Sequence, residues 1–337
     1  MKKRRLGKTE LMVSELGFGC WAIGGTSYGP TDDRESLKAL AFAYDRGINF
    51  FDTADTYGHG HSEELLGETF QESSKRLQVI IASKVGWDFY HGGSKKNFGP
   101  DYIRFACGES LRRLRTDYID LYQLHNPKLE MIEEGSIFKV LAQLKQEGKI
   151  RHWGVSIHLA KEGAAVIQNG TSETIQAIYN LMDQRIKPEL MPLCEKHDMG
   201  LIAREPLYCG LLSGKYTPES VFVKTDHRNR WMRDKYLADL KKIERIKSVL
   251  NGTRYVTGQV HRKKHVDPVP AVPGTVNLPL KQAAIEFVLY EKAVSAVIPG
   301  MKTISHVEDH LRAVELPQLA AEDVNRLQEL YSGDELL

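Results

Sequence analysis

Short runs of apolar and β-branched residues alternate along the chain with longer segments whose apolar positions recur every three or four residues. The short runs have the length of strands buried on both faces, and the longer segments have the period of amphipathic helices. The predicted strands are Ser14–Phe18, Asn49–Asp52, Val79–Ser83, Ile119–Leu124, His152–Ser156, Thr174–Tyr179, Leu201–Arg204 and Ala293–Ile298. The predicted helices are Asp33–Asp45, the stretch opened by Ser62–Gly67, Pro100–Leu114, Ser136–Gln146, Lys161–Gln168, Pro188–Lys196, Val307–Val314 and Glu322–Leu330.

This alternation indicates the α/β class, with a parallel sheet covered by helices. Eight strand–helix units favour a closed (β/α)8 barrel, the TIM barrel, over an open doubly wound sheet, if a long helix before residue 293 belongs to the seventh unit. The segment Lys3–Glu15 predicts an N-terminal β-hairpin that caps the barrel floor, with Gly7-Lys8 as its turn. A chain of 337 residues fits one such domain over residues 1–337.

A long insertion before the last strand interrupts the alternation. Its first part, Asp234–Leu250, predicts a charged amphipathic helix, and Asn251–Pro279 is rich in glycine and proline and contains the basic cluster Arg262-Lys263-Lys264. A long irregular segment in a compact domain is either a solvated insertion or a functional loop. Both interpretations of residues 251–279 remain open, the second being a lid over the cofactor or substrate.

The composition narrows the class of protein. Apolar residues make up 42% and charged residues 27%, which is typical of a globular chain, and the net charge of +2 gives no basic field for nucleic acid. No apolar segment reaches the length needed to span a membrane, and the basic Lys2–Arg5 end lacks the apolar region of a signal peptide. The four cysteines are scattered, so we expect reduced thiols and a cytoplasmic location. Nothing in the composition favours one oligomeric state over another.

Four ionisable residues follow three successive predicted strands. Asp52 and Tyr57 follow the second strand, Lys84 the third and His125 the fourth. Because the carboxyl ends of barrel strands converge on one mouth, we expect these side chains to meet. The sequence therefore predicts a site for proton transfer to a carbonyl oxygen.

The expected roles follow from elementary acid–base chemistry. A tyrosine with its usual pKa of ~10 is a slow proton donor at neutral pH, and a nearby ammonium lowers that pKa. We expect Lys84 to have this effect on Tyr57, and Asp52 to hold Lys84 by a salt bridge. His125 would bind the carbonyl oxygen.

Each of these residues alone has a more ordinary interpretation, as a helix cap, a core phenol, a surface charge or a structural imidazole. Their joint occurrence at three consecutive strand ends favours chemistry. Lys84 also admits a Schiff-base mechanism, that of a lyase or aldolase, if its pKa were depressed. The neighbouring Asp52 opposes that mechanism, because a carboxylate keeps a lysine charged.

Two motifs indicate other kinds of site, a Rossmann-type dinucleotide site and a metal site, and we reject both. Gly17–Ala22 matches the dinucleotide fingerprint G-x-G-x-x-A, but Ile23–Pro30 follows it and cannot form the helix that the motif requires. His59 and His61 suggest a metal pair, yet no third ligand is nearby in the sequence, so we expect no metal.

Four segments together resemble the aldo-keto reductase superfamily: Phe51–Gly58, Ser83–Gly86, Leu121–His125 and Gly154–Ser156. The resemblance runs from about Arg4 to the C-terminal region, apart from residues 251–279. It implies that Asp52, Tyr57, Lys84 and His125 are a catalytic tetrad, with Tyr57 the general acid in reduction and the base in oxidation. It also implies NADPH, or NADH as a second possibility, bound without a Rossmann domain.

The resemblance assigns cofactor contacts position by position. Ser156 and Gln176 match residues that hold the nicotinamide carboxamide, whereas Ile157 stands where an asparagine is usual. Arg204 stands where an aromatic residue stacks on the nicotinamide, and a guanidinium plane can also stack on a ring. Gly19 and Trp21 are two further cofactor-binding positions that the resemblance implies. The pyrophosphate loop is matched by Pro206, Leu207, Gly210, Leu211, Ser213 and Lys215.

The adenosine end of the cofactor matches the segment that begins at Gly300. Lys302 stands where a basic residue pairs with the 2′-phosphate, which favours NADPH. His306, Asp309 and His310 replace the usual glutamine, glutamate and asparagine around the adenine.

The substrate side is predicted from residues that follow strand ends. Trp21, Tyr28, Trp87 and Asn126 are the candidates, and Trp231 would close over the pocket. These aromatic residues favour a small-molecule carbonyl substrate with an apolar or sugar-like surface. The sequence thus predicts an NADPH-dependent carbonyl reductase. A Schiff-base lyase on the same barrel and a weakly active, cofactor-binding regulatory subunit are the alternatives.

Overall fold

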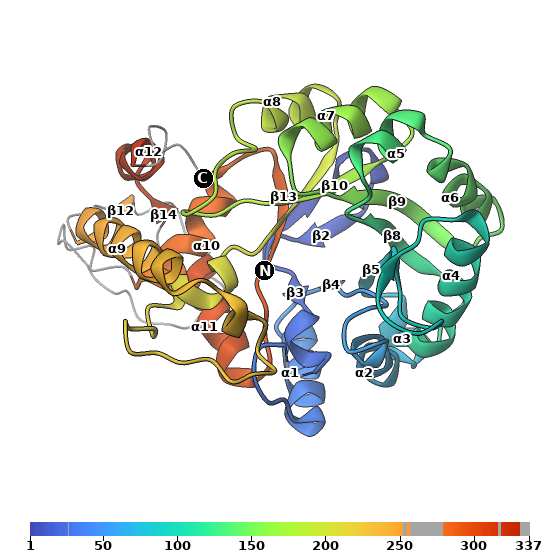
Figure 1. Ribbon diagram of the computed structural model, residues 1–337, viewed down its shortest axis with the longest axis horizontal. Coiled ribbons are helices and arrows are strands. Elements are labelled where there is room, and N and C mark those ends of the chain that lie inside the picture. The colour runs from blue at the N-terminus through green and yellow to red at the C-terminus, as the bar shows by residue number, and fades with distance from the viewer. Residues whose placement is uncertain (26, 252–254, 257–278, 316–317, 331–337) are drawn as a thin grey trace, which may run out of the picture.

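Eight parallel strands form the barrel in the computed structural model (Figure 1), which describes residues 1–25, 27–251, 255–256, 279–315 and 318–330. Their order is β13-β11-β10-β9-β8-β5-β4-β3, and isolated parallel bridges from Leu16 to Val297 and from Gly19 to Gly300 nearly close the barrel. The predicted barrel is confirmed. The strands are β3 (Phe18–Gly19), β4 (Phe50–Asp52), β5 (Ile80–Val85), β8 (Ile119–His125), β9 (Ile150–Ser156), β10 (Thr174–Ile178), β11 (Gly200–Arg204) and β13 (Val294–Ile298).

Helices cover the outside of the barrel, and two of them have the predicted bounds. In α1 the Asp32 carboxylate accepts a hydrogen bond from the Glu35 amide, and α4 begins with Pro100, where the missing amide hydrogen costs nothing. No described helix has the length and apolarity needed to cross a bilayer. The helices are α1 (Asp33–Asp45), α2 (His61–Phe70), α3 (Ser73–Arg76), α4 (Pro100–Leu114), α5 (Leu129–Glu134), α6 (Ile137–Gln146), α7 (Ala160–Asn169), α8 (Leu190–Lys196), α9 (Arg233–Leu250), α10 (Leu280–Tyr290), α11 (Ile304–Glu315) and α12 (Ala321–Glu329).

A β-hairpin caps the floor of the barrel, as predicted. It consists of β1 (Lys3–Arg5) and β2 (Met12–Ser14), joined through the 3-10 turn η1 (Gly7–Thr9). Gly7 has a φ of 52°, and a Cβ there would lie 2.1 Å from the Gly200 amide nitrogen, so only glycine fits. Leu6 and Val13 fill the barrel interior from below and leave the opposite end as the mouth.

The same hairpin is tied to the last part of the barrel. The Arg4 guanidinium donates hydrogen bonds to the carbonyl oxygens of Leu289 (2.7 Å) and Val294 (2.8 Å). These carbonyls lie at the end of α10 and the start of β13. The first hairpin strand, β1, and the last barrel strand, β13, are thus held together at the floor.

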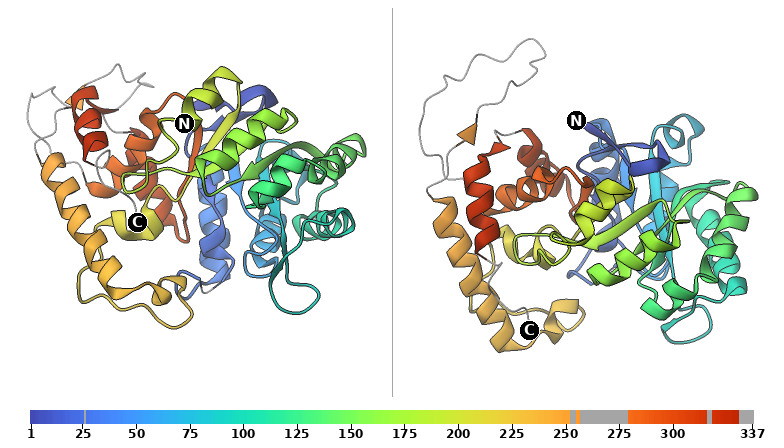
Figure 2. Two further views of the ribbon diagram at one scale, coloured as in Figure 1. Left: turned by 45° about the horizontal axis from the view of Figure 1, so that its top comes forward. Right: turned by 90° about the horizontal axis from the view of Figure 1, so that it is seen from above.

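The segment between β11 and β13 packs beside the barrel. The helices α9 and α12 contact each other, and α9 contacts α10 (Figure 2). Most of the predicted irregular segment, Asn251–Pro279, lies outside the described residues. Tyr255–Val256 (β12) instead forms a short antiparallel pair with Gln318–Leu319 (β14), so the prediction of irregular structure is wrong at these two residues.

The loops at the mouth contain several short elements. The 3-10 turn η2 (Trp21–Ile23) follows β3, so the glycine-rich Gly17–Ala22 motif does not open an α-helix and its rejection is confirmed. The other short elements at the mouth are the hairpin β6 (Trp87–Asp88) and β7 (Lys95–Lys96) and the 3-10 turns η3 (Tyr208–Ser213) and η4 (His227–Arg230).

Candidate active site

Asp52, Lys84 and Tyr57 meet at the mouth of the barrel. The Lys84 ammonium is fully buried and donates hydrogen bonds to Asp52 Oδ1 at 2.5 Å, to the Thr53 carbonyl at 2.8 Å and to the Tyr57 hydroxyl at 3.3 Å. Asp52 and Lys84 belong to the neighbouring strands β4 and β5, and Tyr57 lies in the turn after β4. The predicted meeting of these three side chains is what the geometry shows.

His125 faces the same phenol from the end of β8. The rings of Tyr57 and His125 have centroids 6.0 Å apart and are nearly perpendicular, at 82°. Within the described part of the chain, His125 Nδ1 is buried and has no hydrogen-bond partner. Imidazole and phenol therefore converge where a carbonyl oxygen would receive a proton.

The charges of these groups follow from burial and from one another. Burial raises the pKa of Tyr57, and the Lys84 ammonium opposes this rise without cancelling it. The Lys84 charge thus acts on this pKa in the expected direction, but the larger effect of burial leaves the pKa of Tyr57 raised. Burial lowers the pKa of Lys84, but the Asp52 carboxylate and the Tyr57 hydroxyl together outweigh burial and leave this pKa raised. Burial, aided by the Lys84 charge, holds the pKa of His125 well below its usual range. The site thus contains a protonated phenol, an ammonium and a neutral imidazole.

A pair of buried amides holds the other oxygen of Asp52. Gln176 Nε2 donates to Asp52 Oδ2 at 2.7 Å, and Gln123 Nε2 donates to it at 3.3 Å. Gln176 thus contacts the tetrad, a contact that the sequence analysis did not predict. Gln123 was missed altogether. The signal for it was a buried amide inside an apolar strand, two residues before His125 and therefore on the same face of β8.

The predicted carboxamide and substrate residues Ser156 and Asn126 contact each other. Ser156 Oγ donates to the side-chain oxygen Asn126 Oδ1 at 3.1 Å, and the backbone amide of Asn126 donates to the Ser156 carbonyl at 3.0 Å. Asn126 adopts a left-handed conformation with a φ of 58°. Ile157 is fully buried in the hydrophobic core. Asn126, which directly follows the neighbouring strand β8, thus places an asparagine side-chain amide beside Ser156, whereas Ile157 provides none.

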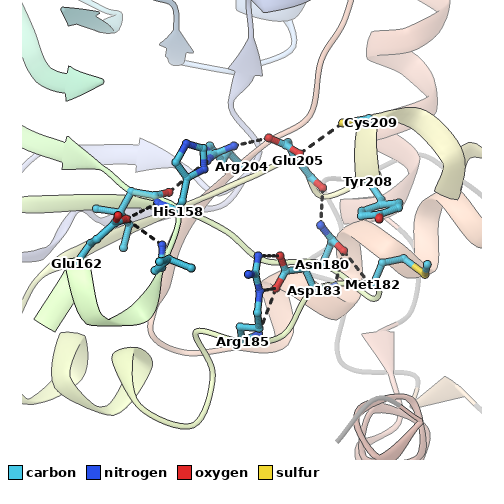
Figure 3. A network of polar contacts seen from close by, with 12 residues as sticks. His158, Glu162, Asn180, Met182, Asp183, Arg185, Arg204, Glu205, Tyr208 and Cys209 are labelled. Atoms are coloured by element: carbon cyan, nitrogen blue, oxygen red, sulfur yellow. Dashed lines mark hydrogen bonds and ion pairs between the residues drawn. The ribbon is translucent and has the colours of Figure 1, made fainter. Parts of the chain in front are cut away.

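Arg204 is fixed at the end of β11 by the network in Figure 3. Its guanidinium pairs with Glu205 and donates to the Ile157 carbonyl and to His158 Nδ1, both at 3.2 Å. Glu205 has a φ of 58°, and its carbonyl accepts a hydrogen bond from Asn180 Nδ2 at 2.9 Å. The ion pair of Arg204 with Glu205 was not predicted from the sequence.

The turn η3 and the loop after it contain the predicted pyrophosphate residues. Leu207 precedes η3, and the left-handed Cys209 and Gly210 interrupt its helical path. Ser213 Oγ is buried and has no partner among the described residues. Lys215 lies exposed beyond the turn, and its charge acts on Lys302.

Lys302 reaches from the start of the predicted adenosine segment to the loop before α1. Its ammonium donates to the carbonyl oxygens of Tyr28 (2.7 Å), Gly29 (3.1 Å) and Pro30 (3.2 Å). Burial lowers the pKa of Lys302, the Asp226 carboxylate opposes this shift, and the cations Arg228 and Lys215 lower the pKa further. Asp226 pairs with Arg228 at 2.6 Å, so Lys302 and Lys215 are the charges that suit a phosphate here.

The remaining predicted adenosine residues differ in their surroundings. His306 Nδ1 accepts from the Lys302 amide at 3.3 Å, and Asp309 pairs with Lys281 at 2.5 Å. His310 is buried, its Nδ1 has no partner in the described ranges, and burial lowers its pKa to about 3. Lys281 joins Asp309 to α10, so this carboxylate is already engaged.

Aromatic side chains surround the mouth, as predicted for the substrate pocket. Trp21 stacks on Tyr57 with centroids 5.9 Å apart and meets Tyr28 edge-on at 5.0 Å. His227 lies 4.9 Å from Trp21 and 6.0 Å from Trp231 and was not foreseen as part of this cluster. Trp87 forms part of β6, further along the mouth.

The two histidines considered for a metal have other partners. His59 stacks on Phe89, with centroids 5.1 Å apart. His61 contacts the carboxylates of Asp33 (2.9 Å) and Glu64 (3.5 Å). Among the described residues, no three histidine, cysteine, aspartate or glutamate side chains lie together so that they could hold a metal ion.

The chain belongs to the aldo/keto reductase family, whose model matches residues 15–332. Among solved structures it is similar to the holo form of the aldo-keto reductase AKR11C1 from Bacillus halodurans, at 29% identity and a TM-score of 0.78, covering 100% of this chain and 98% of that one. The glycerol dehydrogenase AKR11B4 from Gluconobacter oxydans is similar at 26% identity and a TM-score of 0.77, covering 100% and 98%.

Two curated relatives are also named as a reductase or an oxidoreductase. The aldo-keto reductase YhdN of Bacillus subtilis is 34% identical over 265 residues, covering 77% of this chain and 79% of that protein. The uncharacterized oxidoreductase YqkF of the same organism is 31% identical over 330 residues, covering 97% and 96%. Membership of this family supports an oxidoreductase that acts on small-molecule carbonyl compounds and uses a nicotinamide cofactor.

Proposed function

We propose that this protein reduces an aldehyde or ketone to an alcohol with NADPH, and that Tyr57 is the proton donor. The observation that carries the proposal is the buried chain of contacts from Asp52 through Lys84 to the Tyr57 hydroxyl. A phenol is a poor acid at neutral pH unless a cation stabilises the phenolate that forms. Lys84 is that cation, and Asp52 keeps it charged.

The remaining groups position the carbonyl. A neutral His125 donates a hydrogen bond to the carbonyl oxygen and keeps it beside the Tyr57 hydroxyl. As negative charge develops on that oxygen, Tyr57 transfers its proton, and the Lys84 ammonium stabilises the phenolate left behind. Gln176 and Gln123 hold Asp52 so that Lys84 stays in place. The nicotinamide cofactor, when bound, supplies the hydride.

The residues at the predicted cofactor positions fit such a group. Three of them have a buried polar atom without a partner within the described part of the chain: Arg204 Nε, Ser213 Oγ and His310 Nδ1. Buried polar atoms without partners are rare and call for a ligand or water. We assign the carboxamide to Ser156, Gln176 and Asn126, and the diphosphate to the loop from Pro206 to Lys215, with the ring side bounded by Gly19, Trp21 and Arg204.

We further propose that Lys302 selects NADPH through the 2′-phosphate, with His306, Asp309 and His310 around the adenine. Its ammonium must exchange backbone carbonyls for that phosphate, and a charge-assisted bond to a dianion is the stronger interaction. Lys302→Met should weaken NADPH binding about 10- to 100-fold and leave NADH binding nearly unchanged. Titration of protein fluorescence with each cofactor measures both. Equal loss for the two cofactors would contradict the assignment.

The test of the proton donor is Tyr57→Phe. This change removes one hydroxyl and keeps the ring that stacks on Trp21, so NADPH binding should persist. Carbonyl reduction should fall by about 10³-fold, within the range known for general acids. Turnover that survives unchanged would show that another group donates the proton.

Two other functions remain testable alongside this one. A Schiff-base lyase requires a neutral Lys84, whereas Asp52 keeps this lysine charged, so borohydride should trap no substrate adduct. A regulatory role is suggested by a similar protein from Arabidopsis thaliana named as a probable voltage-gated potassium channel subunit beta, 27% identical over 342 residues, covering 99% of this chain and 97% of that one. Tight NADPH binding with no reduction across a broad carbonyl panel would favour that role.

We also infer one barrel domain over residues 1–337 and a cytoplasmic location. The family match over residues 15–332 supports the first inference. The four cysteines support the second, because all four are free thiols.

A further inference from the structure

Lys96 lies at the rim of the proposed substrate pocket. It belongs to β7 of the hairpin that follows β5, and its ammonium donates to the Asn126 carbonyl at 2.5 Å. The same ammonium lies 5.5 Å from the centre of the Trp87 ring. Asn126 directly follows His125, so Lys96 places a positive charge one residue from the imidazole that would hold the carbonyl.

This charge has no carboxylate counter-ion among the described residues. Burial lowers the pKa of Lys96, and Glu162 is the carboxylate whose field acts on it. Glu162 is committed elsewhere, because its Oε2 caps α7 by accepting from the amides of His158 (2.8 Å) and Leu159 (3.0 Å). The Lys96 side chain is exposed at the rim, so an anionic ligand can reach its ammonium without displacing a carboxylate.

His158 supplies a second donor just beyond β9, two residues after Ser156, whose carbonyl accepts a hydrogen bond from the Asn126 backbone amide. Arg204 Nη2 donates to His158 Nδ1, which therefore carries no proton, so the hydrogen of the neutral ring is on Nε2. Burial and the Arg204 charge lower the pKa of His158 and keep the ring neutral, and the Lys96 charge adds to this effect. Arg204 itself is paired with Glu205, so it fixes His158 rather than binding the anion.

We propose that Lys96 and His158 Nε2 form an anion subsite beside His125, and that the preferred substrates are aldehydes or ketones that carry a carboxylate. The inference rests on the proposed reductase function. A carboxylate has two oxygens, one for the ammonium and one for the imidazole N–H. The aromatic rings of Trp21 and Trp87 suit an apolar body between the carbonyl and the carboxylate.

The experiment compares 4-carboxybenzaldehyde with 4-carbamoylbenzaldehyde, which has nearly the same shape and no charge. The wild-type protein should reduce the carboxylate with a kcat/KM roughly fivefold higher, as expected for one charge pair in a partly exposed site. Lys96→Met should abolish this preference, and Lys96→Arg should keep most of it. The matched control is Lys95→Met, because Lys95 is the neighbouring residue of β7 and its side chain points to the other face.

Salt gives an independent measurement. The preference of the wild-type protein should fall as the ionic strength rises from 0.01 to about 0.5 M, because an exposed charge pair is screened. An unchanged ratio in Lys96→Met, or the same loss in Lys95→Met, would overturn the subsite. A failure of the wild-type protein to reduce either aldehyde would instead count against the reductase function, so the two failures are distinguishable.

Discussion

The barrel contains two buried pairs of an aspartate with a basic residue, one at each end. The two basic residues differ in the other groups to which they donate hydrogen bonds. At the floor, Asp120 near the start of β8 pairs with Arg76 at 2.8 Å and with Arg151 at 3.2 Å. Arg76 also donates to Thr116 Oγ1 and to the carbonyls of Val79 and Tyr118. The planar, permanently charged guanidinium suits this static role.

At the mouth, the basic partner is a lysine that also contacts a phenol. The Lys84 ammonium divides its three hydrogens among Asp52, the Thr53 carbonyl and the Tyr57 hydroxyl. Around it lie buried polar atoms without partners among the described residues, such as His125 Nδ1 and Arg204 Nε. The guanidinium at the floor therefore serves stability, whereas the mouth keeps groups available for ligands and proton transfer.

The largest expected effect is that of Lys84→Met at the mouth. Carbonyl reduction should fall by about 10³-fold, because the phenolate of Tyr57 loses its counter-charge. The free energy of unfolding should also fall, by about 3 kcal/mol, because Asp52 is left buried without a cation. Single-turnover kinetics and urea unfolding measure the two quantities. Activity within tenfold of the wild type would separate Lys84 from the chemistry.

The matched change at the floor is Arg76→Met. It should lower the free energy of unfolding by about 3 kcal/mol, because Asp120 then keeps the half-exposed Arg151 as its cation and a hydrogen bond from the Ile81 amide, without the buried guanidinium. The kcat of the folded protein should stay the same. Arg151→Met serves as the control and should cost less than about 1 kcal/mol, as for other exposed pairs. A loss of kcat in Arg76→Met would remove the distinction between the two ends.

The smallest expected effect is that of pH on reduction. Reduction requires Tyr57 protonated, and its raised pKa places the alkaline loss of kcat/KM above about pH 10. It also requires a neutral His125, whose lowered pKa places the acidic loss well below the usual histidine value of ~6.5. The profile should therefore be flat between these limits. An inflection near pH 7 in the wild-type protein would contradict the assigned protonation states.

The sequence predicted the barrel well because its signals are local. Acidic and proline caps fixed the bounds of α1 and α4, and apolar runs located seven of the eight barrel strands. The predicted strand Ser14–Phe18 overlaps β3 only at Phe18, and its first residue belongs to β2. The short pair of β12 with β14 could not be predicted, because it joins residues more than sixty positions apart and neither segment has a strong period. The tetrad was predictable because parallel strands place consecutive strand ends side by side.

The finer contacts of the site depend on side-chain directions that a sequence does not encode. The residue types of Gln176, Asn126 and Arg204 were noted, but their partners depend on rotamers and on left-handed backbone positions. The net direction of the Tyr57 pKa could not be predicted for a related reason. Burial and the ammonium act in opposite directions, and only the structure shows how deeply the phenol lies.

The hydrogen bonds of Arg4 have a consequence for biosynthesis. The arginine emerges from the ribosome nearly three hundred residues before its acceptors Leu289 and Val294. The hairpin at the floor thus waits for the synthesis of the whole barrel before it meets these partners. Closure of the barrel is a late, long-range event, and contacts so distant in sequence are typical of slow folding.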